Sequence, residues 1–175
     1  MNNEKENFEI EIDESRKTYT SEEYDVTIIE IKKKDNLPKD SFLDIDNNIF
    51  EQKNSFLNQT IYLLHYPEGK TMYYSQGIIK AIFPDKYNIE HTCASNFGSS
   101  GGPLLNTIDY KIIGIHKGGS IQEIYYNIGT FLKKPIEEFK TKYRAMSGTK
   151  NMNQNNIQKN DINNNEKEEY KINRI

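Results

Sequence analysis

The sequence has a single cysteine, Cys93, and no tryptophan among its 175 residues. One thiol excludes an internal disulfide and favours a reducing compartment. No apolar run approaches the roughly 18 residues that indicate a membrane-spanning helix. The N-terminal stretch has neither an apolar segment nor a small-residue cleavage site, so no secretory signal is visible. We therefore expect a cytoplasmic protein that does not enter membranes.

An excess of charge of one sign is also missing. The 23 Lys and Arg residues nearly balance 26 Asp and Glu, and the formal net charge is −3. A mixed surface of this kind gives no electrostatic basis for binding nucleic acid. The length predicts one domain, or one domain with tails. Only 35% of the residues are hydrophobic, so the core has to be located from the local pattern.

Short apolar segments between turn residues predict a mostly β protein. Residues 8–13 alternate apolar and polar side chains, and residues 24–31 are rich in β-branched ones, so both predict strands. Residues 37–58 are typical of a long connection. Further strands are predicted at 60–66, 72–83, 111–115 and 125–132. This spacing favours an antiparallel barrel or sandwich.

The C-terminal part of the sequence predicts one helix and a tail. Residues 135–143 have the apolar spacing of a helix, with Pro135 in its first turn. From about residue 144 the sequence is dominated by Asn, Gln, Lys and Glu and offers little to bury. We therefore predict a disordered tail over residues 144–175.

The most distinctive segment is 97–105, which reads Phe-Gly-Ser-Ser-Gly-Gly-Pro-Leu-Leu. Attack on a carbonyl needs an exposed hydroxyl and backbone amides directed at the developing oxyanion. Gly98 allows backbone conformations in which the amides of Gly98 and Ser100 converge. Gly101 and Gly102 would keep Cβ atoms away from a substrate. The alternative is a glycine-rich turn without chemistry, and the glycines alone leave both open.

The wider context resembles the chymotrypsin-fold serine proteases. Their nucleophile motif is Gly-Asp-Ser-Gly-Gly-Pro-Leu, followed by an apolar strand and a glycine-rich pocket wall. Here the motif precedes a strand with Gly114. The resemblance implies that Ser100 is the nucleophile and that Gly98 and Ser100 form the oxyanion hole. Residues 24–31 resemble the family segment Asp-Ile-Ala-Leu-Leu-Lys-Leu, which makes Asp25 the candidate orienting acid. A cap at a strand edge is the alternative for Asp25.

The resemblance also implies a fold and a domain organisation. We expect an all-β, chymotrypsin-like antiparallel barrel with a C-terminal helix. Residues 1–40 would be a remnant of the N-terminal barrel, 41–58 the inter-barrel connection, 59–143 the complete C-terminal barrel and helix, and 144–175 the tail. A first barrel without most of its strands leaves open edges, so we expect marginal stability and a 1–40 segment that packs on the second barrel without closing its own.

The position of histidine departs from the family pattern. In the family the catalytic His precedes the Asp, whereas His65, His91 and His116 all follow Asp25. We interpret His65 and His91 as structural. Loss of the His in a serine protease costs about a millionfold in kcat. The expected function is therefore a trypsin-like serine endopeptidase domain that is weak or inactive as this chain. A non-catalytic peptide-binding module is the alternative.

Ser99 is a second departure. It replaces the motif's Asp, which in trypsin-like zymogens pairs with a new N-terminal amine after activation cleavage. A serine side chain cannot form that ion pair. We therefore expect an oxyanion site that is not built by such cleavage.

The resemblance also locates a specificity pocket. Its floor would lie at Ala94 and Ser95, and its wall at His116, Lys117, Gly118 and Gly119. The floor has no acid to pair with Arg or Lys. The run 113–119, Ile-Gly-Ile-His-Lys-Gly-Gly, resembles glutamyl endopeptidases, in which the His binds an acidic side chain. His116 and Ser95 would hydrogen-bond a carboxylate. A His packed beside the pocket without a ligand is the alternative.

The expected partner is a polypeptide substrate, without a metal or an organic cofactor. Cys93 is interpreted as a small core residue rather than a reactive thiol.

Overall fold

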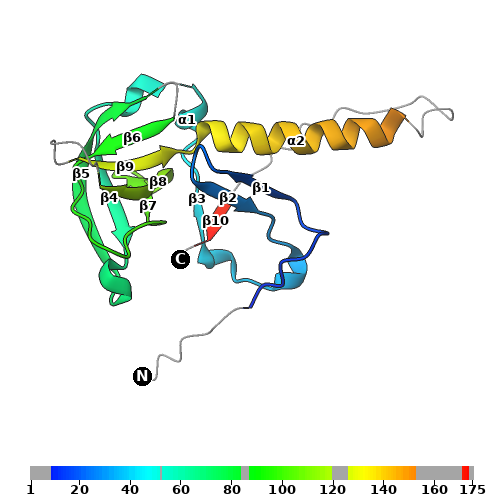
Figure 1. The fold of residues 1–175 in the computed structure, drawn as a ribbon, viewed down its shortest axis with the longest axis horizontal. Helices are drawn as coiled ribbons and strands as arrows, with labels where there is room; N and C mark the ends of the chain where they lie inside the picture. The colour runs from blue at the N-terminus through cyan, green and yellow to red at the C-terminus, as the bar shows by residue number, and fades with distance from the viewer. Residues whose placement is uncertain (1–8, 52, 84–86, 120–125, 153–170, 174–175) are drawn as a thin grey trace.

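The computed structural model describes residues 9–51, 53–83, 87–119, 126–152 and 171–173. Its main feature is a closed barrel of six antiparallel strands in the order β4-β5-β6-β9-β8-β7. Figure 1 shows the barrel beside a smaller N-terminal part, with a long helix crossing the latter. The strands are β4 (Thr60–His65), β5 (Tyr73–Ile82), β6 (Asn88–His91), β7 (Pro103–Asn106), β8 (Ile112–Gly119) and β9 (Asn127–Phe131). This architecture, with a C-terminal helix, confirms the predicted fold class.

The apolar residues that alternate along the barrel strands form the core. In β4, Ile61 and Leu63 are fully buried while their neighbours Tyr62 and Leu64 are half-buried on the outer face. Each fully buried aliphatic side chain stabilises the fold by about 1.5–3 kcal/mol. The same two-residue period that predicted the strand therefore also fills the barrel.

Two of the barrel strands were missed by the sequence prediction. Both β6 and β7 have only four residues, which is too short for a hydrophobic pattern to predict a strand by itself. The predicted strands 60–66 and 72–83 correspond to β4 and β5, and 125–132 corresponds to β9. The prediction at 111–115 was too short, because β8 continues to Gly119. Residues 84–86 and 125 lie outside the described residues.

The N-terminal part contains a two-stranded sheet of β1 (Thr18–Ser21) and β2 (Val26–Ile29). The predicted strand at 8–13 is wrong, since residues 9–13 form no strand. Instead, the guanidinium of buried Arg16 donates to both carboxylate oxygens of Asp35 at 2.6 and 2.7 Å and to the carbonyl of Glu11. These contacts hold the segment in an irregular conformation that its alternation alone did not predict.

The predicted connection 37–58 contains short elements rather than a featureless loop. They are two 3₁₀ turns (Lys39–Ser41 and Lys53–Phe56), strand β3 (Phe42–Asp44) and helix α1 (Asn48–Glu51). A further 3₁₀ turn, Lys33–Asp35, precedes the connection. Strand β3 pairs antiparallel with β10 (Lys171–Asn173).

The tail is more regular than predicted. Helix α2 (Lys133–Met152) continues past the expected end at residue 143, and residues 171–173 form β10. Disorder was therefore wrongly predicted for 144–152 and 171–173, while 153–170 lie outside the described residues. The strand β10 forms by pairing with β3, which is more than a hundred positions away in the sequence. The local sequence therefore gave no sign of it.

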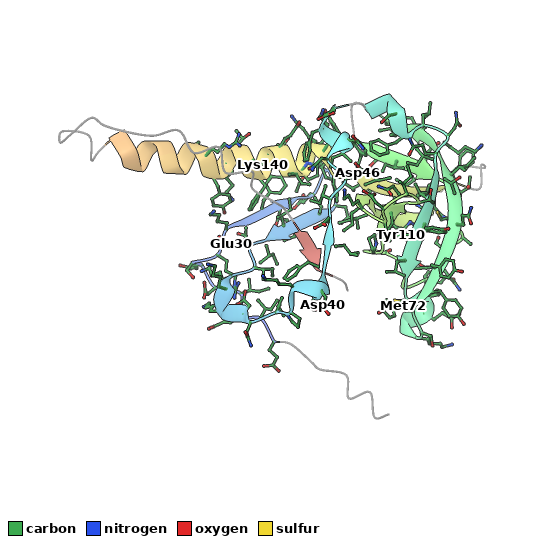
Figure 2. The ribbon with its side chains drawn as sticks, turned by 180° about the vertical axis from the view of Figure 1, so that it is seen from behind. Glu30, Asp40, Asp46, Met72, Tyr110 and Lys140 are labelled. Carbon is green, nitrogen blue, oxygen red and sulfur yellow. The ribbon has the colours of Figure 1, made fainter. Side chains whose placement is uncertain are left out.

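Tyrosine hydroxyls join the N-terminal sheet to α2. Tyr19 and Tyr24 each donate to a different carboxylate oxygen of Glu138, and Thr130 of β9 donates to the carbonyl of Tyr24. In Figure 2, Lys140 on α2 lies above the part that carries Glu30. The segment thus packs on the barrel and helix while its described strands, β1 and β2, stay a two-stranded sheet. The division of the chain at residues 40, 58 and 143 stays a prediction.

No helix in the described part of the chain is both long and apolar enough to cross a bilayer.

Candidate active site

The loop that carries Ser100 is fixed to strand β8. The amide of Gly101 donates to the carbonyl of His116 at 2.8 Å, and the amide of His116 donates to the carbonyl of Gly102 at 2.8 Å. Gly98 and Gly101 have φ values of 82° and 87°, a region that side chains other than glycine's rarely adopt. Among the described residues, the amides of Gly98 and Ser100 donate to no acceptor. The loop therefore offers two free donors beside an exposed serine.

Gly98 is required by packing as well as by its backbone angle. A Cβ there would lie 2.9 Å from the amide nitrogen of Gly69 and 2.9 Å from the carbonyl oxygen of Tyr66. Gly102 has a different role from the one expected. Its Cβ would lie 2.6 Å from the carbonyl oxygen of Leu64, so this glycine allows close packing on β4 rather than room for a substrate.

The hydroxyl of Ser100 points towards β8. Ser100 is exposed, and its Oγ donates to the carbonyl oxygen of Lys117 at 2.6 Å. A pocket of about 220 Å³ lies beside it, lined by residues 98–103 of the loop and by residues 64–66 at the end of β4. A small ligand group can therefore approach the serine from this side.

Ser99 is buried beneath the loop and fixes it through two hydrogen-bond contacts that the sequence did not predict. Its Oγ accepts a hydrogen bond from the amide of Asn96 at 2.9 Å and lies 2.7 Å from Nδ1 of buried His65. Since the Asn96 amide already donates to Oγ, the Ser99 hydroxyl proton is available for a neutral His65 Nδ1. Burial lowers the pKa of His65, which favours that neutral form. His65 is thus buried beneath the loop with Nδ1 engaged by Ser99, and its structural role stays a prediction.

Asp25 lies in the turn between β1 and β2, with φ at 50° and an exposed side chain. Its neighbour Tyr24 anchors the turn to Thr130 of β9. The Nζ of Lys117 donates to Asn88 Oδ1 at 2.8 Å. Burial lowers the pKa of Lys117, and the Asp25 carboxylate opposes this by its charge. Lys117 therefore contacts Ser100 through its carbonyl and interacts with Asp25 through its amine.

His116 is inside the barrel and pairs with His91. Its Nδ1 lies 3.1 Å from His91 Nε2, and the two side chains are 2% and 0% exposed. His91 Nδ1 has no partner in the described part of the protein. A buried acceptor without a partner is better tolerated than a buried donor. The arrangement therefore favours His91 donating through Nε2, which leaves His116 with its proton on Nε2.

The other predicted pocket residues lie around β6, β8 and β9. Ser95 Oγ donates to Asn127 Oδ1 at 2.9 Å, and Ala94 is exposed, with its carbonyl accepting from Ser75. Gly118 and Gly119 lie beyond Ile115, the last β8 residue that pairs with β7, so no strand in the described part of the chain pairs with that edge of theirs. A Cβ at Gly118 would meet nothing within 4 Å.

Cys93 is a fully buried free cysteine. Burial raises the pKa of its thiol to about 12, so the reactive thiolate is not formed near neutral pH. The described residues also contain no group of three His, Cys, Asp or Glu side chains arranged to hold a metal ion.

The comparisons with known proteins identify the family. The model of the trypsin-like peptidase domain family matches residues 4–115, which is well over half of the chain. The chain therefore belongs to this family of trypsin-fold serine proteases. A comparison with curated proteins found no match.

Solved protease structures share the fold. The serine endoprotease from Yersinia pestis aligns with a TM-score of 0.50 and 18% identity over 79% of this chain. The Rv3671c protease of M. tuberculosis, in an inactive form, aligns with a TM-score of 0.52 and 16% identity over 72% of this chain. This chain spans 44% of the first protein and 66% of the second. At such identities the alignments support the fold alone.

Proposed function

We propose that this protein is a serine endopeptidase in which Ser100 attacks the peptide carbonyl. The observation that carries the proposal is the pair of free amides at Gly98 and Ser100 beside the exposed Ser100 hydroxyl. Amides held in advance by the surrounding fold stabilise the oxyanion without reorganising during the reaction. Here the contacts of Gly98, Ser99 and Gly101 provide that rigidity.

Asp25 is the proposed orienting carboxylate. Its charge acts on Lys117, whose carbonyl accepts the Ser100 hydroxyl. The Asp25 carboxylate and the Ser100 hydroxyl are therefore both close to Lys117 of β8. A group that accepts the Ser100 proton would be held between them, as the Asp of a catalytic triad holds its base.

We further propose a preference for an acidic side chain before the cleaved bond. His116 Nδ1 is engaged by His91, so Nε2 with its proton is the atom left for a ligand. Ser95 donates its hydroxyl proton to Asn127 of β9, a strand that pairs with the β8 strand carrying His116. A carboxylate would accept a hydrogen bond from His116, and one from Ser95 once that hydroxyl turns away from Asn127, while Lys117 would add a positive charge nearby.

A fluorophosphonate probe tests the nucleophile. Its phosphorus accepts the Ser100 oxygen and loses fluoride, which leaves a stable covalent adduct. We expect the purified chain to be labelled at Ser100 and Ser100→Ala to lose the label completely. Ser41→Ala, in the 3₁₀ turn before β3, should be labelled as the wild type is. Undiminished labelling of Ser100→Ala, or none of the wild type, would contradict the proposal.

A pair of matched peptides tests the substrate preference. We expect peptides with Glu before the cleaved bond to react at least tenfold faster than the same peptides with Leu, because one charge-assisted hydrogen bond contributes about 1.5–3 kcal/mol. His116→Asn should reduce this ratio towards one. Equal cleavage of both peptides by the wild type would refute the preference while leaving the nucleophile unaffected.

A peptide-binding module without catalysis is the second candidate. The unpaired edge of Gly118 and Gly119 supports it, because an extended peptide can pair with such an edge through main-chain hydrogen bonds. This function predicts that peptides bind equally well to the wild type and to Ser100→Ala, and that neither protein reacts with the probe.

A further inference from the structure

The outer face of the barrel carries a cluster of aromatic rings that the proposed reaction does not use. Tyr62 of β4 stacks on Tyr110, with ring centroids 6.1 Å apart, and Tyr74 of β5 meets the Tyr62 ring edge-on at 5.8 Å. Tyr74 is 73% exposed and Tyr110 is 58% exposed. Figure 2 shows Tyr110 on the side of the barrel that faces the N-terminal part. Exposed apolar groups gathered in this way are typical of an interaction site.

The rings belong to a groove of about 360 Å³ without a charged side chain. The register of β4 with β5 places Leu64 opposite Tyr74. The register of β4 with β7 places Tyr62 opposite Leu105, so these side chains share the outer face. Such a groove accepts an apolar side chain and disfavours a charged one. Among the described residues, its lining consists only of leucines and tyrosines: Leu43, Tyr62, Leu64, Tyr74, Leu105 and Tyr110.

Tyr110 is held in position by the turn between β7 and β8. The buried side chain of Asn106 accepts hydrogen bonds from the amides of Ile108 and Asp109 at 3.0 and 2.9 Å. The φ of Tyr110 is 58°, which lies in the left-handed region and costs free energy for a bulky side chain. A strained conformation that the surrounding structure maintains is a reason to look for a function. Here it keeps the Tyr110 ring against Tyr62.

The groove is continuous with the pocket beside Ser100. Leu64 lines both of them, and Tyr62, two residues earlier on β4, lines the groove. Two residues of a strand span about 7 Å, so an extended peptide covers the same distance with two residues of its own. One peptide can therefore occupy the pocket and the groove together.

The order of the strands gives the direction of such a peptide. Strand β7, which follows the Ser100 loop, lies between β8 and β4 in the barrel. The Ser100 hydroxyl is directed at β8, and β8 also carries His116, the group proposed to bind the side chain before the cleaved bond. The groove lies on the β4 side instead. The part of the substrate after the cleaved bond therefore runs over β4.

We infer that this groove binds an apolar side chain, preferably an aromatic one, about two to four residues after the cleaved bond of the polypeptide substrate. This rests on the proposed function of Ser100. The occupant is the substrate because only a chain that also passes the Ser100 pocket uses the continuity through Leu64. Binding energy from this remote side chain would help to hold the reacting carbonyl at Ser100.

The emission of a tryptophan in the peptide tests the groove, because this chain has no tryptophan of its own. The probes are alanine-based peptides with Glu before the cleaved bond and one Trp at the second, third or fourth position after it. They are titrated into Ser100→Ala, which prevents cleavage. We expect one of them to bind at least tenfold tighter than the same peptide with Trp placed before the Glu, and with blue-shifted emission. Tenfold corresponds to about 1.4 kcal/mol, which burial of one aromatic side chain exceeds.

Substitutions of tyrosine locate the binding in the groove. Adding Tyr110→Ala should remove the tenfold gain and the blue shift, whereas Tyr110→Phe, which keeps the ring, should retain both. Tyr73→Ala is the matched control, because Tyr73 is an exposed tyrosine of β5 that does not line the groove, and it should bind as the parent does. Thermal unfolding shows whether each variant folds. Equal affinities for all peptides, or full binding by Tyr110→Ala, would overturn the inference.

Two further measurements separate the alternatives. Sedimentation that shows a dimer of the wild type, lost in Tyr110→Ala, would assign the groove to a second copy and overturn its role in substrate binding. Fluorophosphonate labelling tests the nucleophile independently, and Tyr110→Ala should be labelled at the wild-type rate because the small probe does not reach the groove. Labelling without a tighter Trp peptide would overturn the groove and retain Ser100. Tight Trp binding without labelling would overturn the nucleophile and, with it, the substrate role of the groove.

Discussion

Gly77→Ala should destabilise the protein by about 3 kcal/mol or more, which is at the upper end for overpacking. Gly77 lies on β5 opposite Ile61 of β4. A Cβ at this position would be 2.3 Å from the amide nitrogen of Cys93 and 2.8 Å from its Cα. These are backbone atoms of the segment that follows β6, so no side-chain rotation relieves the overlap. The strand or the segment has to move, and hydrogen bonds between Ile78 and Thr92 are lost with it.

Urea unfolding of the wild type and the variant measures this effect. Gly118→Ala is the matched control, because its Cβ meets nothing within 4 Å, and its stability should stay within about 0.5 kcal/mol of the wild type. A Gly77→Ala variant as stable as Gly118→Ala would contradict the prediction, because it would mean that β5 and the backbone of Cys93 are farther apart than in the structure.

Acid should destabilise the protein between about pH 6.5 and pH 4.5 because of the pair His91 and His116. Burial lowers the pKa of His91 to about 3 and that of His116 to about 4, and each is lowered further by the charge of a neighbouring histidine. In the unfolded chain both histidines titrate near 6.5. As the pH decreases, the unfolded state therefore binds protons that the folded state does not, and folding loses roughly 2 kcal/mol for each imidazole.

Urea unfolding at several pH values tests this expectation. His65 also has a lowered pKa from burial and adds to the same slope. The carboxylates of Asp13 and Asp35, with pKa values of about 2, lose their stabilising contribution only below their unfolded value near 4. His91→Gln keeps a hydrogen-bonding side chain without titrating and should have a shallower slope. A free energy of unfolding that is constant over this range would be incompatible with two neutral buried imidazoles.

Features that depend on neighbouring residues could largely be predicted from the sequence. The glycines around Ser100 have backbone angles and close contacts that only glycine tolerates, so the motif carries its own conformational information. The alternation in β4 follows burial on one face of the strand. Cys93 is also buried in the core, as the sequence predicted. The strand predicted at 24–31 was close, since β2 spans Val26–Ile29 and Asp25 lies in the turn just before it.

Features that depend on distant residues were not read from the sequence. The strand predicted at 8–13 was overridden by the pair Arg16 and Asp35, which are separated by 19 positions. The three-residue strand β10 exists through its pairing with β3. In both pairs, the local sequence around one partner does not predict its contact with the other.

The sequence by itself determined that the protein carries a glycine-rich loop with a serine, set in an antiparallel barrel. It could do so because backbone conformation and strand burial depend on neighbouring residues. Only the tertiary structure decided what surrounds Ser100. It brought the backbone carbonyl of Lys117 to the Ser100 hydroxyl, His65 into contact with Ser99 and His91 into contact with His116. These contacts join residues from 17 to 34 positions apart, and closing the barrel is what brings them within hydrogen-bonding distance.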